Sequence, residues 1–417
     1  MNPRDLPASP PIASPAGAQS AATFPALAQS VHGRRLVYLD GAASTLTPQC
    51  VIDAIADYQS FDHANVHRGV HALAERATAR FEDAREAVRD FIHASSAREV
   101  VFTRGATEAL NLVAIGLGAG LRPGDEVIVS AIEHHANLVP WQMACARSGA
   151  RLRFIAVRDD GTLDIDGFER LLGPRSRVLA VTQASNVLGT LPDVAALVAR
   201  ARAAGMVTVV DGAQAVAHAR VDVQALGCDF YAFSGHKMYG PTGIGVLYGR
   251  ESALERIPAL FGGGDMIEAV TLESASYAGL PARLEAGTPN ISGAVGLHAA
   301  IRFLGSFDRP RLLDAEHRLL AAMEAGLSGV AGVRVLAAGT PKQGALSFVV
   351  DGVHAHDVGT VLDRRGIAVR AGHHCAMPVM QRFGVPATVR ASLSVHNTQG
   401  DVQALLDGVR EACERLR

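Results

Sequence analysis

Lysine is unusually scarce in this chain. Of the 39 lysines and arginines among its 417 residues, only Lys237 and Lys342 are lysines. A bias of this kind usually reflects nucleotide composition, so the scarcity has no functional meaning by itself. It does limit any reaction that needs a lysine amine to two candidate residues.

Cysteine is also scarce, with five residues in all: Cys50, Cys145, Cys228, Cys375 and Cys413. Their number is odd, they are widely spaced, and no two form a Cys-x-x-Cys pair. These features argue against a disulfide framework and against a zinc site. We expect one or two of them at most to take part in chemistry and the others to be small core residues.

An excess of one charge and long apolar runs are missing as well. The net charge is −2, which gives no electrostatic reason to expect nucleic acid or an anionic membrane as a partner. No apolar run reaches the roughly 18 residues of a membrane span. The first 30 residues are rich in Ala, Pro and Ser, and no apolar segment precedes Ala26–Ala28 as a signal peptide would require. We therefore expect residues 1–23 to be a disordered extension and the protein to be cytoplasmic.

What is present is an alternation of strand and helix patterns between residues 98 and 250. Short β-rich runs alternate with helical stretches, which is typical of βαβ units and of a mainly parallel sheet covered by helices on both faces. The expected strands are 100–102, 126–130, 152–157, 178–182, 207–210, 230–233 and 244–248, and the expected helices are 109–117, 138–147 and 192–204. Ligands of such sheets bind at the carboxyl ends of the strands.

The last third of the chain predicts a smaller α+β unit. Its expected helices are 312–327, 356–365 and 401–416, and its expected strands are 345–350, 367–370 and 389–395. A chain of 417 residues divides naturally into one large and one smaller domain. The expected fold class is therefore α/β.

Two expected strands of the large domain end in residues with chemistry. The strand 207–210 leads into Asp211, and the strand 230–233 leads into Ser234-Gly235-His236-Lys237. Alone, Asp211 is equally well explained as the cap of the next helix. A lysine directly after a buried strand is unusual, because lysine is rarely buried without a role, and burial makes its amine nucleophilic toward an aldehyde. Together the two residues predict a pyridoxal phosphate site in which Lys237 binds the aldehyde and Asp211 keeps the pyridine nitrogen protonated.

Two further turns supply candidate cofactor contacts. Gly105–Glu108 lies between an expected strand and an expected helix, where free backbone N–H groups bind anions; a plain N-cap at Thr107 is the alternative. Ser234 and His236 flank the lysine and could hold the same phosphate. The turn Glu133–Asn137 follows another strand, and one of its two histidines could lie against a cofactor ring, although a lone histidine is more often structural.

The third constellation is a loop in the smaller unit. His373, His374 and Cys375 follow one another after Gly372. Adjacent residues rarely point at one metal ion, so we expect no metal here. A thiol beside two imidazoles instead predicts a reactive nucleophile. Arg390, on the expected strand 389–395, could bind a substrate carboxylate in bidentate geometry.

Jointly, these motifs resemble those of the group II (SufS-like) cysteine desulfurases, members of the class V aminotransferase superfamily of pyridoxal-phosphate enzymes. The resemblance runs from about Phe24 to the C-terminus. Gly372–Cys375 before Ala-Met-Pro is similar to the group II signature and unlike the longer cysteine loop of group I. The other matching stretches are 38–40, 65–69, 133–141, 185–190, 211–216, 233–239, 285–290, 370–378 and 390–392.

The resemblance implies a fold-type I architecture and a homodimer. Residues 24–36 would pack with the small domain. Residues 37–303 would form the large domain that binds pyridoxal phosphate, and residues 304–417 the small C-terminal domain that carries the cysteine loop.

The resemblance also implies a set of cofactor contacts. Lys237 would hold pyridoxal 5'-phosphate covalently and move the α proton of the substrate, His134 would stack on the ring and act as an acid, and Asp211 would pair with the ring nitrogen. Gln214 would bond the ring oxygen. The residues implied for the phosphate are Thr107, Ser234, His236 and, from the second subunit, Thr288. At Ala106 the chain departs from its relatives, which carry a second threonine there, so only the backbone N–H of Ala106 can serve the phosphate.

The implied reaction converts L-cysteine to L-alanine. Cys375 would attack the substrate sulfur and keep it as a persulfide, while Asn186 and Arg390 hold the substrate carboxylate. Arg370 and His67 are the other implied substrate-binding residues, and His67 resembles part of a loop at the active-site mouth of the dimer. A SufE-like or SufU-like protein would accept the sulfur for iron–sulfur cluster assembly.

Three other functions stay open. A selenocysteine lyase has the same fold and cofactor, so only relative rates on L-cysteine and L-selenocysteine would separate the two. An ordinary class V aminotransferase needs no cysteine, and Cys375 weighs against it. A non-catalytic assembly partner is disfavoured because Lys237, Asp211, His134 and Cys375 are all retained; a colourless protein would favour it.

Overall fold

The structure is a computed structural model, and it describes residues 22–417. The predicted disordered extension, residues 1–23, lies almost entirely outside this range. Among the residues described, no helix combines the length and the apolar character needed to cross a membrane.

The centre of the molecule is a seven-stranded sheet with the order β4-β10-β9-β8-β7-β5-β6. Every neighbouring pair is parallel except that β10 runs antiparallel to both β4 and β9. The mainly parallel α/β sheet predicted from the sequence is therefore confirmed. The strands are β4 (Val100–Thr103), β5 (Glu126–Ser130), β6 (Arg151–Ile155), β7 (Ser176–Thr182), β8 (Val207–Asp211), β9 (Phe230–Ser234) and β10 (Gly245–Gly249).

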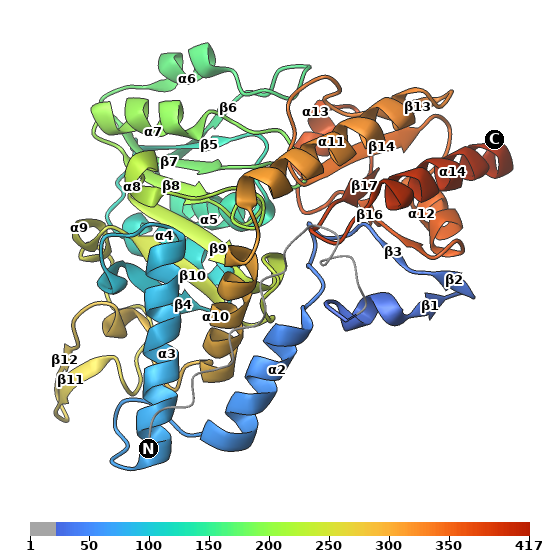
Figure 1. Ribbon diagram of the computed structural model, residues 1–417. Coiled ribbons are helices and arrows are strands. Elements are labelled where there is room, and N and C mark those ends of the chain that lie inside the picture. The colour runs from blue at the N-terminus through green and yellow to red at the C-terminus, as the bar shows by residue number, and fades with distance from the viewer. Residues whose placement is uncertain (1–21) are drawn as a thin grey trace.

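Helices cover both faces of this sheet, because alternate residues of each strand point to opposite faces. In β7, Val178 and Ala180 belong to a hydrophobic cluster formed with a first group of helices, on one face of the sheet. Leu179 and Val181 belong to a cluster formed with a second group, on the other face. The first group is α4 (Ala106–Gly118) and α5 (Val139–Ser148), and the second includes α2 (Gln49–Asp57), α3 (Ala72–Phe91), α7 (Val194–Ala203) and α10 (Ile291–Gly305). Figure 1 shows this layered arrangement.

A smaller unit, called here the C-terminal unit, comprises the elements from α11 onward and lies to one side of the large sheet (orange and red in Figure 1). Its antiparallel sheet has the order β13-β14-β17-β16 and shares a separate hydrophobic cluster with three helices. Its elements are α11 (Arg309–Ser328), β13 (Val333–Val335), β14 (Ala345–Val350), α12 (Ala355–Asp363), β16 (Arg370–Gly372), α13 (Met377–Arg382), β17 (Thr388–Ser392) and α14 (Gln399–Leu416).

The prediction of one strand over residues 367–370 was wrong. The structure has two short strands there, β15 (Ile367–Ala368) and β16. β15 pairs in parallel with β3 (Val37–Tyr38) near the N-terminus, whereas β16 pairs with β17. The chain changes partners at Val369, and the period of the side chains carries no information about which strand is the partner.

The segment before β3 contacts both parts of the molecule. The Phe24 ring lies 5.7 Å from that of Phe303 in α10 and 5.2 Å from that of His396, which follows β17. The strands β1 (Ser30–Val31) and β2 (Arg34–Arg35) form a hairpin. From it, Arg35 donates a 2.7 Å hydrogen bond to Asp401 in α14.

Several elements had no counterpart in the sequence analysis. They include α2, α3, α10 and an exposed hairpin formed by β11 (Ile267–Val270) and β12 (Ala275–Tyr277). The short helices are α6 (Ile165–Leu171), α8 (Val223–Leu226), α9 (Glu251–Leu254) and single turns at Pro25–Ala28, Tyr58–Asp62, Ala97–Glu99, His135–Asn137, Gly235–Lys237 and Ala282–Leu284.

Candidate active site

Asp211 and Lys237 lie at the carboxyl ends of two adjacent strands. Asp211 is the last residue of β8, and it pairs with Ala232 of β9, from which the chain continues into Lys237. Glycine follows Asp211 because a Cβ at Gly212 would lie 1.9 Å from the Tyr231 ring. The sequence thus places a carboxylate and an amine at the sheet edge where ligands bind.

The protein leaves both groups incompletely paired. Asp211 is buried and accepts one hydrogen bond, 2.9 Å long, from the Ala213 N–H. Among residues 22–417, the Lys237 amine has no hydrogen bond or ion pair. Burial raises the pKa of Asp211 and lowers the pKa of Lys237, and the attraction between the two charges opposes both shifts. An unpaired carboxylate oxygen and an unpaired amine fit the ring nitrogen and the aldehyde of pyridoxal phosphate.

A candidate anion site lies at the start of α4. Its N-cap residue, Gly105, has no side chain to cap the helix, and Ser234 Oγ accepts a 2.8 Å hydrogen bond from the N–H of Ala106, the first helical residue. A cavity of about 490 Å³ opens here, lined by Arg104, Gly105, Thr107, Glu108, Asn111, Leu112, Ile115, Ser234, His236 and Phe261. A Cβ at Gly105 would lie 3.3 Å from Ser234 Oγ, so glycine keeps the approach open. Backbone N–H groups and hydroxyls at a helix N-terminus fit a phosphate.

Two histidines near this edge are neutral. Burial, followed by the charge of Lys237, lowers the pKa of His134 to about 3 and that of His236 to about 4. His134 Nδ1 accepts a 3.0 Å hydrogen bond from the Ala136 N–H, so the remaining proton is on Nε2. Neutral His134 can therefore present a flat face and one N–H donor to a ligand.

The turn that carries His134 is anchored by Glu133, which the sequence analysis did not single out. Glu133 is buried and accepts hydrogen bonds from the Ser130 hydroxyl, from Asn137 Nδ2 at 2.7 Å and from the Thr182 N–H at 2.8 Å. Burial raises the pKa of Glu133 to about 8. The carboxyl group ties the ends of β5 and β7 to the turn, which fixes the position of His134.

Arg390 lies in a buried cluster of polar groups. Its Nη1 donates to the Asn186 carbonyl oxygen at 2.9 Å, and its Nη2 to Asp40 Oδ1 at 3.1 Å. Arg370 Nη2 lies 3.0 Å from the other Asp40 oxygen, because β16 and β17 place Arg370 opposite Arg390. The Nε of Arg390 is buried and has no hydrogen-bond partner within residues 22–417, so one N–H is free for a ligand oxygen.

Asp40 is a residue that the sequence analysis missed. It lies 350 positions from Arg390 along the chain, so no local pattern joins them. Its position at the end of the short apolar run Val37–Leu39 and its place in the matching stretch 38–40 were signals, but neither gave it a role. Gln214, by contrast, was singled out, and its Nε2 donates a 2.8 Å hydrogen bond to the Ala42 carbonyl in the same N-terminal segment.

Cys375 is exposed on a strained loop. His374 and Cys375 both have positive φ angles, 52° and 54°, which are unfavourable for residues with a Cβ. The loop is held from outside: Asn186 Nδ2 donates to the His374 carbonyl at 2.6 Å, and the His135 N–H donates to the Cys375 carbonyl at 2.7 Å. Contacts from outside the C-terminal unit therefore position the loop that carries the thiol.

The two imidazoles beside the thiol differ. His374 is buried, with Nε2 3.2 Å from the Thr388 carbonyl oxygen and 2.9 Å from its hydroxyl, and burial lowers its pKa to about 3. Exposed His373 accepts a 3.2 Å hydrogen bond from the Cys375 N–H.

Within the part of the chain that the structure describes, no group of three or more side chains is arranged to hold a metal ion.

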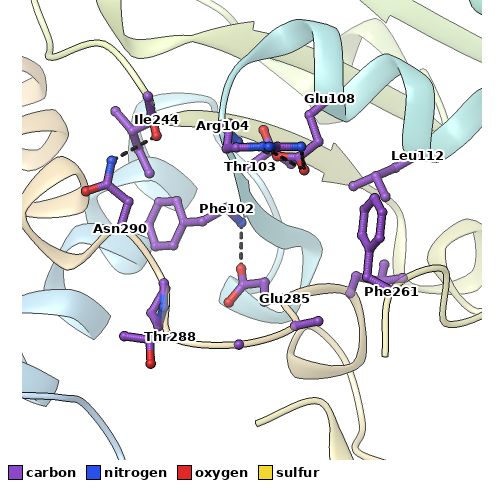
Figure 2. A pocket seen from close by; sticks show the side chains of 15 residues that line it. Phe102, Thr103, Arg104, Glu108, Leu112, Ile244, Phe261, Glu285, Thr288 and Asn290 are labelled. Carbon is purple, nitrogen blue, oxygen red and sulfur yellow. Dashed lines mark hydrogen bonds and ion pairs between the residues drawn. The ribbon is translucent and has the colours of Figure 1, made fainter. Parts of the chain in front are cut away.

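Thr288 and His67 are not brought to the other predicted residues within one chain. Thr288 is exposed on the wall of a neighbouring cavity of about 340 Å³ (Figure 2). That cavity shares the walls Arg104, Glu108 and Phe261 with the cavity at α4. His67 Nε2 lies 2.9 Å from Glu82 Oε1. Their predicted roles depend on a second subunit and stay predictions.

Comparisons with known proteins show the family of this chain. A model of the class V aminotransferase family matches residues 37–405. A probable cysteine desulfurase of Vibrio cholerae is 48% identical over 396 residues, which cover 95% of this chain and 98% of the relative. A cysteine desulfurase of Klebsiella pneumoniae is 49% identical over 391 residues, with 93% of this chain and 96% of the relative covered.

Solved structures give the same result. The crystal structure of the cysteine desulfurase CsdA from Escherichia coli has a TM-score of 0.88 and 43% identity, and the match covers 96% of this chain and 98% of that chain. A C-DES variant with glycine covalently linked to its PLP cofactor shares the fold, with a TM-score of 0.79 and 21% identity, over 94% of this chain and 99% of that chain.

The chain therefore belongs to the class V aminotransferase family, whose members are pyridoxal-phosphate enzymes. Within that family it belongs to the cysteine desulfurases. The resemblance drawn from the motifs and the fold that it implied are confirmed.

Proposed function

We propose that this protein binds pyridoxal 5'-phosphate at Lys237 and uses it to take sulfur from L-cysteine, leaving L-alanine and a persulfide on Cys375. The observation that carries this proposal is the convergence of three groups on one edge of the sheet. The Lys237 amine and the buried Asp211 carboxylate follow the adjacent strands β9 and β8, and the loop with the exposed Cys375 thiol is hydrogen-bonded to His135 in the turn after β5.

The residues present would hold the cofactor in a defined orientation. Asp211 would pair with the ring nitrogen, Gln214 would bond the ring oxygen, and His134 would lie on the ring. The start of α4, with Thr107, Ser234 and His236, would hold the phosphate, and the partner subunit would add Thr288. Bound there, the cofactor supplies an electron sink for the negative charge that develops on the substrate carbon.

The substrate carboxylate would bind to Arg390 and Asn186. Nη1 and Nη2 of Arg390 each donate one hydrogen bond, to Asn186 and Asp40, and the Nε–H has no partner among the described residues, so it is one donor available to the carboxylate. Arg370 shares Asp40 with Arg390 and adds positive charge to the pocket. Such a clamp fixes the α carbon of the substrate relative to Lys237.

Lys237 would take the α proton and return a proton to carbon. Burial favours its neutral form, and only a neutral amine can act as a base. His134 carries its proton on Nε2 and would donate a hydrogen bond from that atom. The exposed surface of Cys375 leaves a path by which a sulfur acceptor can reach the thiol.

The transfer of sulfur from L-cysteine to Cys375 needs no external oxidant. A bond forms between Cys375 Sγ and the substrate sulfur as the substrate's Cβ–S bond breaks. The electron pair of that bond stays with the carbon, which then takes a proton, so alanine leaves and the thiol has become a persulfide. Cys375 is suited to this step because a thiolate is a strong nucleophile.

The wider assignment follows from the family. We propose a cytoplasmic homodimer in which residues 37–303 form the cofactor domain and residues 304–417 the small domain, with residues 24–36 packed on the latter. His67 would contribute to the substrate site at the dimer interface. A SufE-like or SufU-like acceptor would pass the sulfur on for iron–sulfur cluster assembly.

The deciding experiment measures alanine and sulfide from L-cysteine, with and without a candidate acceptor. The protein as purified should be yellow, and after cysteine treatment the peptide containing Cys375 should carry one extra sulfur by mass spectrometry. L-selenocysteine, assayed in parallel, would show which of the two substrates is preferred. A colourless protein, or an extra sulfur on another cysteine, would overturn the assignment.

A further inference from the structure

His135, the neighbour of His134, makes two hydrogen bonds to the cysteine loop, both on the C-terminal side of the Cys375 α carbon. Its N–H donates to the Cys375 carbonyl at 2.7 Å, and its Nε2 accepts from the Met377 N–H at 3.2 Å. His135 and Met377 lie 242 positions apart in the chain. One residue of the large domain thus contacts the nucleophile's loop through both its main chain and its ring.

The loop needs such contacts to keep its shape. Consecutive positive φ angles at His374 and Cys375 are unfavourable and persist only when the surroundings hold them. On the N-terminal side of Cys375, Asn186 and His373 provide the restraints. On the C-terminal side of Cys375, up to the first turn of α13, the restraint comes from the two hydrogen bonds of His135. One is donated by its main-chain N–H and the other is accepted by its ring.

We propose that His135 is a positioning residue for Cys375, one whose neutral imidazole accepts the Met377 N–H and holds the thiol at the Lys237 edge. This inference rests on the proposed function, in which Cys375 is the nucleophile. A protonated imidazole has no lone pair to accept with, so protonation of His135 opens the C-terminal side of the loop.

The surroundings of His135 keep it neutral at ordinary pH. Burial, followed by the neighbouring His373, lowers the pKa of His135. The His373 ring lies 5.8 Å away and the His134 ring 6.3 Å away, and the loop that His135 bonds also brings Cys375 to it. The tie is therefore intact above the lowered pKa and is lost as the pH falls through it, below the usual value near 6.5.

The two adjacent histidines thus have different tasks. His134 has its Nδ1 engaged within its own turn and lies close to Lys237. His135 is turned toward the C-terminal unit. Because both belong to one short turn anchored by Glu133, the turn fixes the cofactor-facing group and the thiol's loop in one frame.

The test compares His135→Gln with His135→Leu in the cofactor-loaded dimer. A glutamine carbonyl oxygen can take the place of Nε2 as acceptor but does not titrate, whereas leucine keeps the bulk and removes the acceptor. The matched control is His354→Leu, since exposed His354 also accepts a main-chain N–H, that of His356, but is the N-cap residue of α12.

Three readouts are taken, and the first of them is independent of turnover. Hydrogen–deuterium exchange of the peptide spanning residues 372–383 should speed up in His135→Leu and return to the wild-type rate in His135→Gln. The rate of persulfide formation on Cys375 should fall about tenfold or more in His135→Leu, because an error of about 1 Å in the position of a reacting group can cost up to ~10²-fold. Exchange of the substrate's α proton with solvent should change less than twofold in both variants.

The pH profile separates the ring's titration from simple packing. Persulfide formation in the wild type should fall on the acid side, and His135→Gln should extend it to lower pH. The inference is overturned if glutamine is as defective as leucine, or if leucine changes neither exchange nor persulfide formation. Failure of the proposed function looks different, because then the wild type itself forms no persulfide on Cys375.

Discussion

The two halves of the active site are built in opposite ways. Asp211 and Lys237 come from strands in the middle of the seven-stranded sheet, where β8 and β9 are fully buried and paired on both sides. Cys375 comes from a strained, exposed loop held by a few hydrogen bonds from elsewhere in the chain. The sheet fixes its residues through many cooperative contacts, whereas the loop depends on individual ones.

This contrast matches the two chemical tasks. A cofactor must be held in one orientation, and buried strand ends provide that rigidity. A persulfide must be reached by a second protein, so its carrier has to be exposed, and exposed segments have fewer contacts to hold them. Changes at the sheet should therefore remove the cofactor chemistry altogether, while changes at the loop should remove sulfur transfer alone.

The largest effect is expected for Lys237→Ala. It removes one of the two lysines of the chain, and the other, Lys342, is buried in a separate contact with Glu324. Covalent cofactor attachment should be lost, and turnover of cysteine should fall by more than about 10³-fold. Borohydride reduction followed by peptide mapping is the measurement. A reducible adduct that survives in the variant would place the attachment on another amine.

Cys375→Ser should separate the halves most clearly. The variant keeps Lys237 and the clamp at Arg390, so it should bind cofactor and cysteine and exchange the α proton at close to the wild-type rate. Sulfide and alanine should not form from cysteine, because a serine hydroxyl is a far poorer nucleophile toward sulfur than a thiolate. Some selenium release from selenocysteine should survive, since the carbon–selenium bond is weaker. Full turnover of cysteine by the serine variant would show that the loop has been misread.

Asp211→Asn tests the sheet without removing the attachment. The amide is nearly the same size and can still accept from the Ala213 N–H, but it cannot keep the ring nitrogen protonated. Cofactor should remain bound through Lys237 and the phosphate site, while α-proton exchange in deuterated solvent slows by about 10²-fold, within the range of an acid–base or charge contribution. An unchanged exchange rate would remove Asp211 from its assigned role.

The contrast between the sheet and the cysteine loop also explains which site residues the sequence could predict. Asp211 and Lys237 were found because apolar strands are short, continuous runs, and the residue after each run marks the sheet edge. Ser234, His236 and Thr107 follow from the same logic. Contacts that join distant segments were not predictable. Asp40 with Arg390 is one such contact, and Glu133 with the Thr182 N–H is another.

Strand partners were the other limit. The split of residues 367–370 between β15 and β16 depends on which strands lie alongside, and those strands come from Val37–Tyr38 and from Thr388–Ser392. The helices α2, α3 and α10 were not predicted either, although α2 has a clear apolar face with Val51 and Ala54 buried. Cys375 itself was found from its neighbours in sequence, but nothing local shows that His135 and Asn186 hold it.

The smallest effect is expected for Asp40→Asn, which tests the boundary between the two halves. Asp40 bridges Arg370 and Arg390, and Arg390 is only 2% exposed. Asparagine keeps one acceptor oxygen but loses the charge, and its amide group would face one of the two guanidinium groups. A hydrogen bond to a charged group contributes about 1.5–3 kcal/mol, so losing part of that clamp should raise the KM for cysteine about tenfold. The kcat should change less, because neither Lys237 nor Cys375 is touched, and thermal unfolding should shift down by a few degrees at most.

Asp363→Asn is the control, since Asp363 pairs with His32 at the exposed surface, where such pairs contribute little. An unchanged KM in Asp40→Asn would mean that Arg390 is positioned by Asn186 and β17 alone, and that the loop half of the site depends less on the N-terminal segment than these contacts indicate.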